Sequence, residues 1–102
     1  MFIQYTSANL RIKIDTGNTE VNALENSKVF VKIKRREHQV TKEAIIVNLK
    51  EQVAMCYLEP DDLILPGNYD YQVLIETRDG YTIKSSLGSF YVNPSIMDKR
   101  NL

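Results

Sequence analysis

The chain has 102 residues, the size of one ordinary domain with a single hydrophobic core. It holds 13 basic and 13 acidic residues, so its formal net charge is zero, with 25% of residues charged and 43% hydrophobic. This composition argues against a disordered chain, a coiled coil, a membrane-spanning helix and a protein that binds nucleic acid through bulk positive charge. The single cysteine, Cys56, cannot form an internal disulfide, so folding must rest on packing. The first seven residues lack the basic leader and apolar stretch of a signal peptide, and we expect synthesis in a cytoplasm.

Apolar residues recur at every second position along most of the chain, which predicts strands rather than helices. In chain order, we expect strands over residues 10–14, 29–33, 44–49, 53–58, 69–75, 81–83 and 90–92. Turn residues separate these runs, and Asp79-Gly80 is the strongest hairpin signal because Gly80 supplies a positive φ. Residues 18–27 carry the least pattern and are expected to form a loop, while Gly88 is expected at a bulge or bend. Seven short strands separated by turns predict an all-β protein, an antiparallel immunoglobulin-like β-sandwich of about seven strands.

The segment before the most regular strand reads Gly67-Asn68-Tyr69-Asp70-Tyr71. In immunoglobulin-like sandwiches a tyrosine at this place turns the chain between sheets, and its hydroxyl bonds to nearby main chain. We therefore expect a structural corner at Gly67, Tyr69 and Tyr71, with the Tyr71 ring filling space that a disulfide spans in antibody domains. The alternative is that both tyrosines simply favour strands and occupy an inward face.

Three short motifs follow one another between Gly67 and Pro94. They are Gly-x-Tyr-x-Tyr-x-Val from Gly67, a hairpin with Asp79-Gly80, and Gly-x-Phe-x-Val from Gly88. This order resembles the immunoglobulin-like domain of phage tail and baseplate proteins, and is similar to the N-terminal domain of phage baseplate upper proteins, over most of residues 8–94. The resemblance implies a non-enzymatic virion structural protein of a phage or prophage, a tail or baseplate component that mediates subunit assembly. It further implies a place in the virion after synthesis in the host cytoplasm, with other virion proteins as partners and a homo-oligomeric state.

No residue pattern typical of catalysis is present, so we expect no enzyme activity, no cofactor and no metal. The only histidine, His38, lies in an expected polar turn and is interpreted as solvated, and Cys56 lies in an apolar strand as a buried, inert thiol. Glu59, Asp61 and Asp62 flank Pro60 and are interpreted as capping carboxylates of a short turn. A calcium site is the alternative for these three acids, because calcium prefers dense oxygen ligands.

The zero net charge conceals an uneven distribution along the chain. Residues 28–42 hold six basic groups and one acid, whereas residues 51–79 hold seven acids and one basic group. If these segments form two faces of opposite charge, the faces would favour head-to-tail assembly. The alternative interpretation is that the outward charges keep the strands soluble and protect their edges. We expect no nucleic-acid binding, because the basic strand has too few aromatic residues, and no membrane binding.

The outward positions of two strands suggest a contact surface. The period of two places Phe30 and Tyr91 outward, and we take as the candidate interface Phe30, Lys32, Lys34 and Tyr91. We expect a single domain over residues 1–102, with arms at 1–7 and 95–102 that are flexible or ordered by assembly. The alternative function is a carbohydrate- or cell-wall-binding β-sandwich module involved in host adsorption. It needs two or three exposed aromatics on one face, whereas the pattern places Tyr69, Tyr71 and Tyr81 inward.

Overall fold

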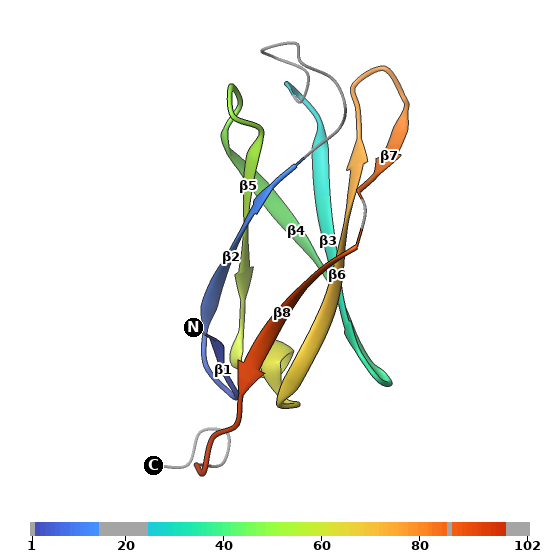
Figure 1. The fold of residues 1–102 in the computed structure, drawn as a ribbon. Coiled ribbons are helices and arrows are strands. Elements are labelled where there is room, and N and C mark those ends of the chain that lie inside the picture. Colours follow the sequence, from blue (N-terminus) through green and yellow to red (C-terminus); the bar gives the residue numbers. More distant parts are fainter. Residues whose placement is uncertain (1, 15–24, 86, 98–102) are drawn as a thin grey trace.

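The computed structural model describes residues 2–14, 25–85 and 87–97, and these residues form an all-β structure (Figure 1). Its strands are β1 (Phe2–Ile3), β2 (Ala8–Lys13), β3 (Lys28–Arg35), β4 (His38–Asn48), β5 (Val53–Leu58), β6 (Gly67–Glu76), β7 (Thr82–Lys84) and β8 (Gly88–Asn93). A 3-10 turn, η1 (Pro60–Leu63), connects β5 to β6. Most of the loop expected over residues 18–27 lies outside the described residues. The described part of the chain contains no helix long and apolar enough to cross a membrane.

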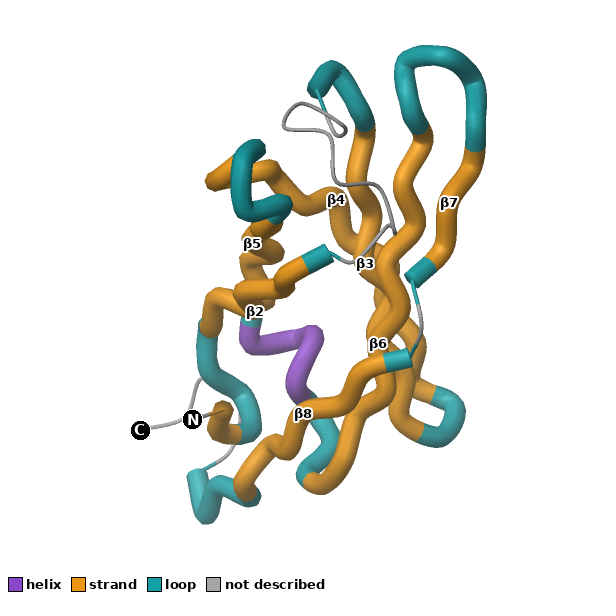
Figure 2. Tube along the Cα trace, turned by 45° about the horizontal axis from the view of Figure 1, so that its top comes forward, coloured by secondary structure: helices purple, strands orange, loops and turns teal. Residues whose placement is uncertain are grey.

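The strands are hydrogen-bonded in the order β1-β8-β6-β3-β4-β5-β2, with β7 also paired to β6. The predicted antiparallel arrangement is wrong in one place, because β1 pairs with β8 in parallel and makes the sheet mixed. The other strand pairs are antiparallel. Figure 2 shows the strands curving around a common interior, with η1 in the opening between β2 and β8, so the described sheet is nearly barrel-shaped.

Strand β4 explains why the pairing runs through a single continuous sheet. It is 11 residues long; its first part, His38–Ala44, pairs with β3, and its last part pairs with β5 across a register shift between Ile46 and Asn48. We predicted a strand beginning at residue 44 and a turn over residues 36–39. The observed turn is tighter, because Arg35 pairs with His38 and Arg36 takes a φ of +53°. The polar stretch 38–43 therefore forms a strand that its composition did not indicate.

The hairpin between β6 and β7 matches the prediction made from Asp79-Gly80. Gly80 has a φ of +86°, and the Thr77 N–H donates to the Tyr81 carbonyl at 2.9 Å. Tyr81, however, is 70% exposed, so the prediction that it points inward is wrong. It precedes β7 at the end of the hairpin, beyond the interior that the paired strands enclose.

The core is formed by alternate side chains of β2, β3, β5 and β6, as the period of two predicted. The largest completely or almost completely buried side chains are Tyr69, Ile14, Ile33, Leu58, Leu63, Ile75, Val29, Val31, Val73 and Val92. Strand β4 departs from the predicted phase, because Ala44 is its buried residue and Ile45 is 66% exposed. The register with β3 sets this phase by placing Ala44 beside the buried Val29.

The N-terminal segment, expected as an arm, is hydrogen-bonded to the rest of the chain. The Gln4 N–H donates to the Asn93 carbonyl at 2.8 Å, and the Gln4 side chain donates to the Ile64 carbonyl at 2.8 Å. The Phe2 ring contacts the Phe90 ring, with centroids 5.0 Å apart. Ser95 bonds to the Gln4 side chain at 3.0 Å, so both ends of the described chain meet beside η1.

Candidate functional site

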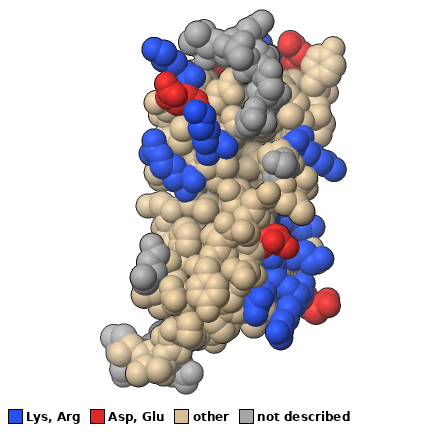
Figure 3. Space-filling view, in the orientation of Figure 1, with Lys and Arg blue, Asp and Glu red and all other residues tan. Residues whose placement is uncertain are grey.

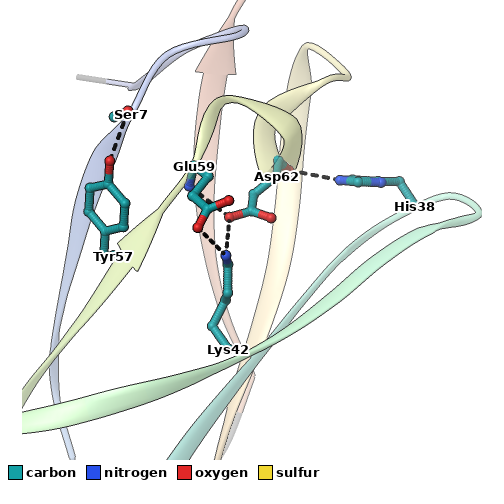
Figure 4. Close-up of polar contacts among 6 residues, drawn as sticks. All are labelled: Ser7, His38, Lys42, Tyr57, Glu59 and Asp62. Carbon is teal, nitrogen blue, oxygen red and sulfur yellow. Dashed lines mark hydrogen bonds and ion pairs between the residues drawn. The ribbon is translucent and has the colours of Figure 1, made fainter.

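One charged cluster lies inside the fold, between β4 and η1 (Figure 4). Asp62 is 6% exposed, and its Oδ2 accepts from the Lys42 Nζ at 3.0 Å and from the Glu59 N–H at 2.7 Å. The Lys42 Nζ also lies 3.6 Å from Glu59 Oε1. Lys42 points inward because it pairs with Val31, which is completely buried. The cluster therefore ties β4 to the 3-10 turn through a mostly buried ion pair.

Two of the three acids around Pro60, Glu59 and Asp62, take the capping role that the sequence suggested. Glu59 and Asp62 form a reciprocal capping box, in which each side chain accepts from the backbone N–H of the other. The ammonium of Lys42 lies within 4 Å of both carboxylates and balances one of their two negative charges. In residues 2–14, 25–85 and 87–97, no group of three or more His, Cys, Asp and Glu side chains is placed to hold a metal ion.

His38 is not the fully solvated turn residue that we predicted. It begins β4 and is half-buried, and its Nε2 lies 2.8 Å from the Asp62 carbonyl oxygen. Because a carbonyl only accepts, His38 Nε2 carries the proton in this contact. The ring also meets Tyr69 edge-on, with centroids 6.2 Å apart. His38 therefore holds the β3–β4 hairpin against η1, and its role is structural.

The Tyr69 hydroxyl makes both hydrogen bonds of a closed corner. It donates to the Leu65 carbonyl at 2.8 Å and accepts from the Leu65 N–H at 3.1 Å. The ring is completely buried and stacks on Phe90 at a centroid distance of 5.2 Å. The corner thus satisfies two main-chain groups where the chain enters β6.

Gly67 and Tyr71 flank this corner in different ways. Gly67 has a φ of +115°, a conformation that favours glycine, and the Arg35 guanidinium lies over it. Tyr71 is partly buried, and its ring covers Gly88 so closely that a Cβ there would overlap it. Gly88 is the first residue of β8 and pairs with Tyr71, so its lack of a side chain makes room for the ring.

Three groups in this region have raised pKa values, each for a physical reason. Burial raises the pKa of the Cys56 thiol, opposed by the charge of Lys42 and assisted by that of Asp62. The hydrogen bond to Asp62 raises the pKa of Lys42 above its ordinary value against the opposing effect of burial. Burial raises the pKa of Tyr69, with the Leu65 hydrogen bond and the charge of Arg35 acting against it.

These shifts predict that the fold loses stability at alkaline pH. In each case the unfolded chain releases the proton at a lower pH than the folded chain, so stability falls as pH rises. The loss should begin near the ordinary cysteine value of 9.0 and continue through 10.0 for tyrosine and 10.5 for lysine. Urea denaturation from pH 7 to about 11 measures it. In a Cys56→Ala variant the onset should move upward, and a wild-type stability that stays constant across this range would contradict the account.

The four candidate interface residues lie on one face of the sheet. Strand register places Phe30 beside Leu74, Lys32 beside Gln72, and Lys34 beside Asp70, all with side chains away from the core. Tyr91 pairs with Asn68 at the end of the same face and is 52% exposed. We call this the β3–β6 face. It is hollowed by a groove of about 270 Å³ lined by Phe30, Lys32, Thr41, Gln72, Leu74 and Lys84.

The basic and acidic segments do not form two opposed faces in the described residues. Strands β3 and β6 lie side by side, with Lys28 opposite Glu76 and Lys34 opposite Asp70. The acid Asp62 pairs with Lys42 inside the fold. Figure 3 shows basic side chains gathered at the lower right, over the β3–β4 hairpin, with acidic side chains beside them. The charges that the sequence separates are therefore largely brought together by strand pairing.

A second exposed surface, which the sequence pattern did not indicate, lies on the outer side of β4 and β5. It carries Ile45, 66% exposed, with Val47 and Tyr57, 43% and 55% exposed. Tyr57 is held by a hydrogen bond of 3.1 Å to the Ser7 hydroxyl, drawn in Figure 4. The alternation along residues 44–49 predicted that Ile45 and Val47 point inward, and this is wrong because the register with β3 places Ala44 inward instead.

Comparison with known proteins gives no family. No family model and no curated protein matches this chain. The fold is similar to part of a crystal structure of a "putative glycoside hydrolase" from Bacteroides vulgatus, with a TM-score of 0.58 and 15% identity. The match covers 92% of this chain and 16% of that chain, so this protein corresponds to a small part of the larger one. At this identity the likeness extends to the fold alone.

Proposed function

We propose that this chain is a non-enzymatic structural module with an immunoglobulin-like sandwich architecture. Strands β1, β8, β6 and β3 with the first part of β4 make one layer, and the rest of β4 with β5 and β2 makes the other. The Tyr69 corner at the start of β6 supports this assignment, because that bond pattern is a hallmark of such sandwiches. The crossing of β4 between layers accounts for the continuous pairing path.

The module's role is assembly, as a tail or baseplate component of a phage or prophage particle. The observation that carries this proposal is the gathering of Phe30, Lys32, Lys34 and Tyr91 on the β3–β6 face. The exposed apolar group of Ile45, Val47 and Tyr57 on the opposite layer adds a second surface suited to protein contacts. The partners are other virion proteins and further copies of the chain. The phage context rests on the sequence resemblance.

Particle composition tests this role. Particles released by the organism that encodes the chain would be purified on a density gradient and analysed by quantitative mass spectrometry. We expect the chain at a fixed ratio to the tail proteins, retained after a high-salt wash. Particles that lack the chain would contradict a virion role.

A carbohydrate- or cell-wall-binding module is the second candidate, and the fold likeness to part of a glycoside hydrolase favours keeping it. Sugar rings stack on exposed aromatics, and Tyr91 is available on the β3–β6 face. Tyr57 lies on the outer side of β5 and Tyr81 in the β6–β7 hairpin, so the three most exposed tyrosines come from different parts of the fold. Glycan-array binding lost in Tyr91→Ala and kept in Tyr57→Ala would favour this candidate over assembly.

A further inference from the structure

Charge and apolarity on the β3–β6 face follow a regular arrangement. The register pairs each outward residue of β3 with one of β6, in the rows Lys28–Glu76, Phe30–Leu74, Lys32–Gln72 and Lys34–Asp70. Every charged residue on the β3 side is a lysine, and every charged residue on the β6 side is an acid. The Phe30–Leu74 row extends on both sides, to Glu43 on β4 and to Lys84 on β7. It therefore reads acid, apolar, apolar, base across four strands.

These charges are free to meet a partner. The ion pairs within 4.0 Å in the described residues are Lys13–Glu51 and the two made by Lys42. Glu43, Lys84, Lys34 and Asp70 take part in none of them, and all four are exposed. The groove between Phe30, Leu74, Lys32 and Lys84 leaves the centre of the face hollow.

We propose that a second copy of this chain packs its own β3–β6 face against this one. The twofold axis of the dimer lies between the two packed faces, over the gap between β3 and β6, and runs parallel to these strands. Such a rotation exchanges the two strands and keeps each row at its own level. Lys28 and Lys34 then face the acids Glu76 and Asp70 of the other copy. Lys32 faces Gln72, and Phe30 faces Leu74. Glu43 faces Lys84 in both directions. The face is thus complementary to itself, which is what an isologous dimer requires.

The size of the face sets the strength of the dimer. Strand β3 has eight residues, about 26 Å at ~3.3 Å per residue, and four strands span about 19 Å. The face is therefore roughly 500 Å² on each copy, or about 1,000 Å² in total, near the lower limit for a specific interface. Sheet twist separates the corners of packed sheets, so the rows of Phe30 and Lys32 carry most of the contact. The dimer is accordingly concentration-dependent.

A charge-reversal pair tests this geometry. Glu43→Lys alone places two lysines opposite each other at both ends of the interface, and Lys84→Glu alone does the same with two acids. Each variant should self-associate roughly 30-fold more weakly than wild type in sedimentation velocity. An equimolar mixture of the two should restore association, because each chain then offers the complement of the other. Glu43 and Lys84 lie on strands separated by β3 and β6, so a contact within one chain does not explain that rescue. Thermal melting of each variant confirms that it is folded.

The outcomes separate this inference from the proposed function on which it rests. A wild-type chain that stays monomeric to about 1 mM, or a dimer unaffected by both reversals, overturns the twofold contact. If both variants lose self-association and their mixture does not restore it, the pairing of Glu43 with Lys84 is overturned. If the mixture of variants restores the dimer but purified particles lack the chain, the twofold contact is supported and only the virion role is refuted.

Discussion

Replacing Lys42 by methionine is expected to lower the free energy of unfolding by about 3 kcal/mol and the Tm by about 15 °C. Methionine keeps the length and apolar stem of lysine, so the change removes the charge with little effect on packing. The Asp62 carboxylate, 8% exposed as a side chain, would then keep the Glu59 N–H as a donor but lose the positive charge that faces it. A buried charge left without its partner is among the most costly single defects in a protein.

Two companion variants make this result specific. Lys32→Met removes an exposed lysine of the adjacent strand and should change stability by less than about 0.5 kcal/mol. The double variant Lys42→Met, Asp62→Asn removes both charges and keeps an oxygen for the Glu59 N–H, so it should recover much of the lost stability. Denaturant unfolding of all three measures the effects. A Lys42→Met variant as stable as Lys32→Met would show that the ion pair does not hold β4 to η1.

The second large effect is expected at the corner, where Tyr69→Phe should cost about 2 kcal/mol. The substitution keeps the buried ring and its stacking on Phe90 but removes the hydroxyl. The N–H and carbonyl of Leu65 then lose a shared partner in a half-buried position. Unsatisfied main-chain groups of this kind cost more than a typical hydrogen bond contributes.

Tyr71→Phe is the matched control for the corner. It removes the same hydroxyl two residues further along β6, where the ring is packed over Gly88. We expect a change below about 0.5 kcal/mol for this variant. Urea denaturation of both variants at neutral pH compares them directly. Equal losses in Tyr69→Phe and Tyr71→Phe would contradict a locking role for the Tyr69 hydroxyl.

The sequence predicts well where local chemistry decides the structure. The period-two runs of β2, β3 and β6 specify their buried faces, because one face of each must cover the same core. Gly80 and Asp79 specify the β6–β7 hairpin, because its φ is available mainly to glycine. Glu59 and Asp62 suggest capping because their spacing suits the turn that Pro60 begins.

Register and long-range pairing are not available from such patterns. The inward direction of Lys42 follows from the tight turn at Arg36, which sets the register of β4 on β3. We predicted a longer turn there, so the buried ion pair with Asp62 was missed. The parallel pairing of Phe2 with Val92 joins residues that are distant in sequence, and two residues are too few to show a period.

The complementarity of the β3–β6 face likewise appears only after pairing. In the sequence, the lysines and acids occupy separate segments, and that separation suggested opposed faces. Pairing β3 with β6 places Lys34 beside Asp70 and Lys28 beside Glu76, which turns the separation into alternation across one face. The outward phase of Phe30, predicted from its neighbours, is part of the same face.

The most direct test of the account is a dilution series of ¹H–¹⁵N spectra of the wild-type chain. Self-association through the β3–β6 face predicts concentration-dependent shifts at Phe30, Lys32, Gln72 and Leu74. The shifts of Arg11 and Tyr57, on the outer side of β2 and β5, should stay unchanged. Concentration-dependent shifts confined to the outer side of β2 and β5, or none at any concentration, would contradict assembly through the β3–β6 face.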